Sequence, residues 1–549
     1  MTSQTTVYVA RKILTMNPRQ PEATHVAVRD GRILAVGDRA RMAAWGEHRV
    51  DERYADAVLM PGLVEGHSHL TAGGLAAFTY VGYHARPAPD GGQWAGCRDF
   101  AAVAERLRKA DEALRQSGAA EDAPLLAWGF DPIFFGTERM TTEHLDPVSR
   151  RRPVVVLHAS HHLMNVNTPA LAAAGIDADS EIEGVARFPD GRPNGELQEF
   201  AAMFPVLKLV GNGFRAAGTS EQGLRLFGQL ARRAGVTTAT DLGNDPSDEG
   251  LATLVRVTGE DDYPLRLVTG SMSLTHGRTM QAQAELVRGR MALNHERLRF
   301  GIVKVFADGS IQGFSARLRW PGYFNGAPNG IWNLQPALLR ETILHHHAQG
   351  LQMHIHTNGD EATEVTLDAL EEALSRQPRP DHRHTLQHCQ MADAAQYRRM
   401  ARLGVCANLF VNHVYYWGEA HARLTMGPDR AERLDACRTA LDHGVPLALH
   451  SDAPITPLGP LFSAWCAVNR LTSEGRVLGA AERIGVPEAL RAITLGAAWT
   501  LKLDDRIGSI EVGKQADFCV LGEDPLAVDP VALKDLPVLG TVLAGRPTA

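Results

Sequence analysis

The middle of the 549-residue sequence alternates short apolar segments with amphipathic ones, and this alternation restricts the possible folds more than any other feature. Segments such as PVVVLHA, RFGIVKVFAD and VPLALHSDAP have the length and β-branched composition of buried strands. Segments such as LLRETILHHHAQG and DEATEVTLDALEEALSRQ have helical periodicity. Strands that alternate with helices of this length form βαβ units around a parallel sheet. At least seven such strands end in polar residues, which predicts a closed (β/α)₈ barrel rather than an open doubly wound sheet.

The two ends of the chain have a different pattern. Near the N-terminus, VYVARKILTM and THVAVRDGRILAVGD alternate apolar and polar residues, with the turn Asp30-Gly31 typical of a hairpin. Near the C-terminus, IGSIEVGKQADFCVLGEDP and LPVLGTVLAGRP are again strands joined by glycine turns. We expect residues 1–62 and 504–549 to pair into one small β-sandwich, with two independent β caps as the alternative. The barrel then occupies residues 63–503.

Composition and charge exclude several classes of protein. With 44% hydrophobic and 22% charged residues, the chain is globular rather than disordered, coiled-coil or collagen-like. Its 56 basic and 63 acidic residues give a net charge of −7 without a basic block, which argues against nucleic acid or an anionic membrane surface as a partner. No segment approaches the ~18 apolar residues that span a bilayer, and no secretory signal is evident. The six scattered cysteines form no CxxC motif, so we expect a soluble, cytoplasmic protein.

The segment MPGLVEGHSHL contains the clearest candidate for a metal site. His67 and His69 are two residues apart, so on a strand both imidazoles leave the same face. Two neutral imidazoles side by side are natural ligands for zinc or a similar metal. An isolated HxH motif is more often structural, but this one ends an apolar strand that begins with Pro-Gly.

Polar residues also occur at the ends of other predicted strands. Lys304 lies within GIVKVFADGS, where a lysine among apolar residues is costly unless its charge is paired or removed. His356 ends LQMHIH, His388 lies in HTLQHCQ, and Asp452 follows the apolar run in LALHSD. Each alone could be a buried histidine or a capping aspartate. A barrel brings such strand ends together at its C-terminal face, so jointly they predict a metal centre.

The order HxH, Lys, His, His, Asp on successive strands resembles that of the metal-dependent amidohydrolase superfamily. MPGLVEGHSHL, KVFADGS, HIHTNGDEA, HTLQHCQM and HSDAPITPLGP resemble its amidohydrolase-3 branch, which is YtcJ-like and N-substituted formamide deformylase-like. GFDPIFF, PVVVLHASHHLMNVNTPALAAAGI, DGRPNGELQE and RIGSIEVGKQADFCVL extend the resemblance over nearly the whole chain. It implies a TIM barrel, a terminal β-sandwich, an inserted α/β lid at about residues 85–200, and hydrolysis of amide-type C–N bonds.

By this resemblance, His67, His69 and Asp452 would hold one metal ion. A bound metal lowers the pKa of water towards ~7, so that hydroxide is available to attack a carbonyl carbon. Asp452 would take a proton from the nucleophile and return it to the departing amine. The expected reaction is hydrolysis of an N-substituted formamide, an N-acyl amine or a similar small amide.

The resemblance implies a second metal beside the first. Lys304, carboxylated by CO₂, would bridge to an ion held by His356 and His388, and the carboxylation would turn the buried cation into an anion. His354, which forms a second HxH with His356, and His384 are the alternative ligands. The implied cofactor is zinc, with two ions per chain.

Four residues outside the metal centre are expected to contact the substrate. His162, in HHLMNVN, matches a pattern of the branch, with a structural role as the alternative. Trp320, Tyr323 and Phe324 follow the strand of Lys304 and could shape an apolar pocket, although aromatic residues in such loops often only pack. The consecutive histidines 345–347 lie on a helical pattern and cannot share one face, so we expect them at the surface.

Two other functions stay open at this point. A one-metal deaminase of ring amidines usually has a Glu three residues after the histidine of the fifth strand, where this chain has Gly359. A one-metal site would also leave Lys304 without a role. An inactive structural relative should have lost ligands, and none is missing. We expect a small-molecule amide as the partner, and a homodimer is compatible with such a barrel.

Overall fold

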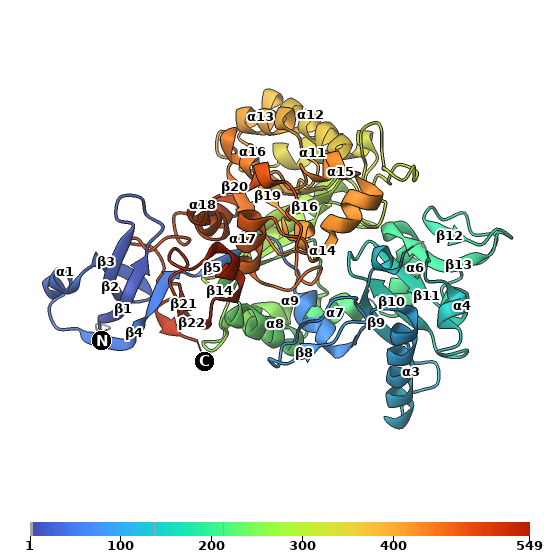
Figure 1. Ribbon diagram of the computed structural model, residues 1–549, viewed down its shortest axis with the longest axis horizontal. Coiled ribbons are helices and arrows are strands. Elements are labelled where there is room, and N and C mark those ends of the chain that lie inside the picture. The colour runs from blue at the N-terminus through green and yellow to red at the C-terminus, as the bar shows by residue number, and fades with distance from the viewer. Residues whose placement is uncertain (1–3, 137, 212, 549) are drawn as a thin grey trace.

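A closed barrel of eight parallel strands forms the centre of the molecule in the computed structural model, which describes residues 4–136, 138–211 and 213–548 (Figure 1). The barrel strands, in chain order, are β5 (Leu63–Glu65), β14 (Val236–Leu242), β15 (Arg266–Met272), β16 (Leu298–Phe306), β17 (Gln352–Thr357), β18 (Thr385–His388), β19 (Cys406–Leu409) and β20 (Leu447–Leu449). The predicted (β/α)₈ barrel is therefore confirmed.

The barrel closes where the segments after its first and last strands meet. A parallel bridge joins Ser68 to Ala453, and the backbone amide of His69 donates to the carbonyl of Ala453 at 2.8 Å. The amide of Asp452 donates in turn to the carbonyl of His67 at 3.1 Å. This seam thus brings three of the predicted ligands into neighbouring positions.

Helices cover the outside of the barrel and bury its apolar residues. They include α8 (Glu221–Arg233), α9 (Asp248–Gly259), α10 (Met280–Arg290), α11 (Pro336–Ala348), α12 (Asp360–Arg376), α13 (Ala394–Leu403) and α16 (Cys437–Asp442). Leu367 on α12 and Leu386 on β18, for example, belong to one large buried cluster between the strands and the helices. Within the described ranges, no helix combines the length and the apolar character needed to cross a membrane.

Both ends of the chain join in one seven-stranded sheet beside the barrel (Figure 1, left). Its strands follow the order β23 (Arg546–Pro547), β22 (Val538–Leu543), β21 (Phe518–Leu521), β4 (Arg49–Pro61), β1 (Thr6–Leu14), β2 (Glu22–Arg29) and β3 (Arg32–Gly37). β21 pairs directly with β4, with Phe518 opposite Pro61, so the alternative of two independent caps is excluded. Asp30 and Gly31 both have positive φ, as expected of a tight hairpin turn.

The segment between the first two barrel strands forms a second α/β unit, which we call the insertion (residues 79–211; Figure 1, right). Its six-stranded sheet has the order β12 (Val185–Arg187), β13 (Pro193–Gln198), β11 (Leu163–Val166), β10 (Val154–His158), β9 (Leu125–Phe130) and β6 (Thr79–Tyr80). Helices α3 (Phe100–Gln116) and α6 (Glu199–Leu209) belong to it, and α7 (Gly213–Thr219) leads back to the barrel. The domain boundaries at 62/63 and 503/504 stay predictions.

Candidate active site

A cavity of about 100 Å³ lies between the C-terminal ends of the barrel strands and the insertion. The insertion and α7 form one wall, which includes side chains of α6. The barrel forms the other wall, and all six predicted ligands line it: His67, His69, Lys304, His356, His388 and Asp452. The structure therefore brings together residues that are spread over nearly 400 positions of the chain.

His67, His69 and Asp452 form one group of potential metal ligands. Their ligand atoms lie within 4.8 Å of one another, and Oδ1 of Asp452 is 3.4 Å from Nε2 of His67 and 3.3 Å from Nε2 of His69. This oxygen is buried, and apart from the two imidazoles no described residue pairs with it. Two imidazoles and a buried carboxylate are a donor set that zinc accepts, so these residues fit a metal ion.

Two of the six residues have a strained backbone. Asp452 has φ 51° and His388 has φ 72°, the left-handed region that residues with a side chain rarely adopt. Such conformations cost about 1–3 kcal/mol and cluster at functional sites, where the surrounding structure holds them. Here the hydrogen bond from the Asp452 amide to the carbonyl of His67 belongs to the barrel seam and fixes this conformation.

Gln387 fixes the orientation of His67 from below the cavity. Its Oε1 lies 2.7 Å from Nδ1 of His67 and also accepts a hydrogen bond from Asn408 at 2.9 Å. Because an amide oxygen only accepts, Nδ1 of His67 carries the proton and Nε2 keeps its lone pair for a ligand. Sequence reasoning missed Gln387, whose one signal is its position directly before His388.

Lys304 is fully buried on β16, as its apolar strand predicts. Its Nζ lies 3.4 Å from Nε2 of His67 and 4.9 Å from the ring centre of Phe306. No described carboxylate lies within 4.0 Å of it. Burial lowers the pKa of Lys304 to about 7, although Asp452 opposes this shift. At pH 7, about half of the amine is therefore in its neutral, nucleophilic form.

His356 and His388 lie side by side, with ring centres 4.5 Å apart. Burial lowers the pKa of both well below the usual value, so both imidazoles are neutral, which is the form that binds metals. Nε2 of His356 lies 3.2 Å from the carbonyl of Gly309, while Nδ1 of His388 is buried without a hydrogen-bond partner in the described chain. Nδ1 of His388, which lies 3.6 Å from Oδ2 of Asp452, is thus available to bind a metal ion.

The two alternative ligands are not among the described residues that line the cavity. Both ring nitrogens of His354 are engaged, Nδ1 with Gln387 at 2.7 Å and Nε2 with the carbonyl of Thr500 at 3.1 Å. His384 is similar, since its Nε2 lies 2.9 Å from Nδ1 of His347 and its Nδ1 accepts from a backbone amide. Hydrogen bonding within the barrel wall therefore accounts for both histidines.

The expectation that residues 345–347 lie at the surface is wrong for two of them. His346 and His347 are buried, because the face of α11 that carries them packs on the barrel and on the end of α12. Nε2 of His346 lies 3.1 Å from the carbonyl of Ser273, and Nε2 of His347 lies 2.7 Å from that of Gln377.

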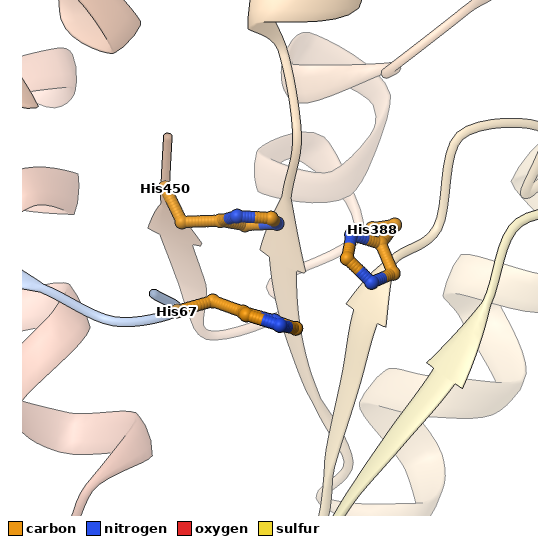
Figure 2. Close-up of side chains that lie close together, drawn as sticks. All are labelled: His67, His388 and His450. Carbon is orange, nitrogen blue, oxygen red and sulfur yellow. The ribbon is translucent and has the colours of Figure 1, made fainter. Parts of the chain in front are cut away.

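His450 is a further buried histidine, which sequence reasoning did not single out. Its ligand atom lies within 4.8 Å of those of His67 and His388, so these three side chains are a second potential metal group (Figure 2). The rings of His450 and His67 stack, however, 4.8 Å apart and 19° from parallel. The nitrogen lone pairs of the two imidazoles lie in the planes of their rings. Because these planes are nearly parallel, the two lone pairs do not point at one nearby metal ion. The signal in the sequence is that His450 directly follows the apolar strand β20 and precedes Asp452 by two positions.

His162 enters the cavity from the insertion. Its Nδ1 lies 2.8 Å from Oε2 of Glu199, and its ring centre is 5.1 Å from that of His356. Burial alone would lower the pKa of His162, but Glu199 raises it above the usual value. Glu199 has φ 61° and donates its backbone amide to the carbonyl of His162, so the pair is held as a unit.

The loop after β16 does not reach the cavity, contrary to the expectation for its aromatic residues. Trp320 is 94% exposed and Phe324 is 58% exposed, while Tyr323 is buried and its hydroxyl donates to the carbonyl of Ala316. The loop is drawn away because the amide of Phe324 donates to the carbonyl of Thr425 at 2.7 Å. The apolar wall of the cavity comes instead from Leu157, Phe200, Met203, Leu207, Phe214, Phe306 and Ile455.

Comparison with known proteins gives consistent matches along the chain. The sequence profile described as "Amidohydrolase family" matches residues 55–549. A putative amidohydrolase, YtcJ, from Bacillus subtilis (strain 168) is 27% identical and is covered over 97% of both chains. An N-substituted formamide deformylase from Arthrobacter pascens is 26% identical over 97% of this chain and 96% of that one. An uncharacterized metal-dependent hydrolase from Pyrococcus horikoshii OT3 has the same fold, with a TM-score of 0.71, 17% identity, and coverage of 96% of this chain and 99% of that one.

Proposed function

The chain belongs to the amidohydrolase family, and from this premise we propose the ligands, the reaction and the substrate class of its active site. It is a metal-dependent hydrolase that acts on C–N bonds. The finer proposal is that the substrate is a small amide, either an N-substituted formamide, an N-acyl amine or a close relative. The similarity to an N-substituted formamide deformylase over 97% of the chain supports this substrate class.

One observation carries the proposal, namely the convergence of the buried His67 and Asp452 with the half-buried His69 at the barrel seam. The carboxylate oxygen that lies 3.3–3.4 Å from the two imidazoles has no other hydrogen-bond partner among the described residues. Leaving such a buried group unpaired costs about 1–3 kcal/mol or more, whereas a divalent cation satisfies it. These three residues would hold the first metal.

We propose a second metal beside it, held by His356 and His388. Lys304, carboxylated by CO₂, would bridge the two ions. Three observations support this: Lys304 is fully buried, its pKa is lowered to about 7, and His388 has an unpaired ring nitrogen. Carboxylation would convert the one buried lysine of the cavity into an anion between two cations. Imidazole and carboxylate donors suit zinc, and we propose two zinc ions per chain.

The chain's own residues would perform the proton transfers. When bound, the metal supplies Lewis acidity, which makes water a stronger nucleophile and polarises the substrate carbonyl. Burial tends to raise the pKa of Asp452, but His69, His450 and Lys304 lower it below its usual value, so Asp452 is a carboxylate near neutral pH. Asp452 would accept a proton from the attacking water and give it to the nitrogen of the departing amine. His162, held by Glu199, would contact the substrate from the opposite wall.

Metal analysis combined with a panel of amides tests the proposal. We expect between one and two equivalents of a zinc-like metal after gentle dialysis, and release of amine from N-formyl or N-acyl amines. Release of ammonia from cyclic amidines, with a single metal and an unmodified Lys304, would instead indicate a deaminase. Full activity with less than half an equivalent of transition metal would refute the proposed chemistry.

A further inference from the structure

Arg215, on α7, lines the cavity without a partner. Among the residues that the structure describes, none forms a hydrogen bond or an ion pair with its guanidinium. Buried arginines of the described chain have such partners; Arg290, for example, binds Asp245 at 2.8 Å, and Arg86 donates to the carbonyl of Pro454 at 2.7 Å. Arg215 is therefore a cation at the cavity wall without a hydrogen bond or an ion pair to any described residue, although the charges of Asp241 and Asp245 act on it.

The acidic residues closest to Arg215 already have other partners. Asp241 accepts a hydrogen bond from Asn244 at 2.7 Å and one from the backbone amide of Leu70 at 3.1 Å. Asp245 is paired with Arg290. Burial raises the pKa of Asp241, while Asn244, His69 and Arg215 lower it, which places Arg215 and His69 around the same carboxylate. Arg215 thus lies on the side of the cavity that holds the first predicted metal ligands.

The surroundings of Arg215 favour one particular kind of ligand. Within the described lining, Lys304 is the only other Lys or Arg, and the neighbouring wall is apolar, with Met203, Leu207 and Phe214. A guanidinium stays protonated at neutral pH and presents a planar fork that matches a carboxylate. One guanidinium beside an apolar wall matches a single carboxylate attached to an apolar group.

We propose that Arg215 binds a carboxylate on the non-reacting part of the substrate, so that the preferred substrates are N-acyl amino acids with apolar side chains. This inference rests on the proposed amide hydrolysis and narrows its substrate class. Arg215 sets specificity in this scheme, while the proton transfers stay with Asp452. The apolar wall would receive the amino-acid side chain.

The test compares N-formyl-leucine with N-formyl-leucinamide, in which a neutral carboxamide of similar size replaces the carboxylate. For the zinc-loaded wild-type enzyme, we expect a kcat/KM at least about tenfold higher for the carboxylate, since a hydrogen bond to a charged group typically contributes a factor of roughly 10–150. Arg215→Met should lower kcat/KM for N-formyl-leucine by a similar factor and leave the value for the amide within about threefold. Arg215→Lys should keep part of the preference, because it keeps the charge.

Arg398→Met, at an exposed position of α13 outside the cavity, is the matched control and should behave as the wild type. Equal kcat/KM values for the two substrates, or an Arg215→Met variant that keeps the wild-type preference, would overturn the role of Arg215 while leaving amide hydrolysis intact. Hydrolysis of neither substrate would count against the proposed function. In that case, calorimetry measures the affinity of the enzyme for the same two compounds. A higher affinity for N-formyl-leucine that is lost in Arg215→Met would support the role of Arg215. Equal affinities for the two compounds would refute it.

Discussion

The Nζ atom of Lys304 lies 3.4 Å from Nε2 of His67, and both side chains are buried at the mouth of the barrel. This contact joins the two proposed halves of the metal centre, because His67 belongs to the first group of ligands and Lys304 would bridge to the second. Buried, and without a carboxylate at ion-pair distance in the described chain, the amine is poised to react with CO₂.

Lys304→Ala should therefore lose most of the bound metal and most of the activity. The reason is that the variant lacks the bridging anion that would stabilise two adjacent cations. Short carboxylic acids added to the variant should restore part of both. Elemental analysis and amine release check the prediction, and mass spectrometry of the wild type should detect the added CO₂. An unmodified ammonium beside a single metal in a crystal structure would contradict it.

Asp452→Asn should reduce kcat by roughly 10²–10⁴-fold with little change in KM, since a positioned acid–base group acts mainly in the transition state. The substitution nearly preserves size but removes both the charge and the proton acceptor. Steady-state kinetics with a formamide or an N-acyl amine, together with a metal determination, are the measurements. If Asp452 only caps the following segment, the variant would lose about 1 kcal/mol of stability. Retention of a tenth or more of wild-type kcat would favour that structural role.

Gln387→Leu should weaken metal binding by about 10–100-fold, a typical effect of losing a hydrogen bond to a metal-binding histidine. The leucine cannot accept the hydrogen bond from Nδ1 of His67, so the ring loses its fixed orientation. Competition with a chelator measures the affinity. Gln281→Leu, at an exposed position of α10, is the control and should bind metal as the wild type does. Equal affinities of the two variants would show that Gln387 does not orient the ligand.

His450→Phe should retain the full metal content. A phenyl ring can keep the stack between His67 and Phe410, whose ring centres lie 4.8 Å and 5.0 Å from that of His450. It also removes two buried nitrogens that have no hydrogen-bond partner in the described structure, so stability should be unchanged or higher. Elemental analysis and thermal unfolding are the measurements. Loss of one metal equivalent would identify His450 as a ligand and replace our assignment.

Asp131→Asn should change how the stability of the protein depends on pH. Asp131 is buried where the insertion meets the barrel, accepts a hydrogen bond from Nε1 of Trp417 at 2.8 Å, and has its pKa raised to about 7 by burial. The folded state thus favours the protonated carboxyl. Its stabilising contribution is complete below about pH 4 and is lost as the pH rises to about 7.

Wild-type stability should consequently fall relative to the Asn variant across this range, by at most about 1.4 kcal/mol per pH unit. Thermal or denaturant unfolding of both proteins at several pH values between about 4 and 8 measures the difference. A constant difference over this range would mean that Asp131 titrates normally in the folded protein.

The barrel and the convergence of its six polar strand-end residues could be predicted from the sequence, because both follow from local patterns. An apolar strand that ends in His or Asp must present that side chain at the same rim as its neighbours. The contacts of Gln387 could not be predicted in this way. They depend on the register between strands, in which Gln387 on β18 lies opposite His356 on β17.

The substrate wall was the least predictable part. Trp320 and Phe324 look like pocket residues in the sequence, yet hydrogen bonds to the segment around Thr425 direct their loop away from the cavity. Four of the seven apolar residues of the wall lie instead on α6 and α7, whose position depends on how a separate sheet packs against the barrel. Such packing between units leaves no periodic signal in the sequence.

The seam of the barrel also has a consequence for biosynthesis. Glu65 and Ser451, which are hydrogen-bonded across the seam, are 386 positions apart, and His67 and Asp452 lie just beyond them. The ribosome synthesises the HxH motif nearly 400 residues before the carboxylate of Asp452. Over that stretch of synthesis, the growing polypeptide carries an incomplete, weakly binding pair of histidines. We expect stable binding of the first metal only after the last strand has docked. Metal binding would then indicate that the whole barrel has closed.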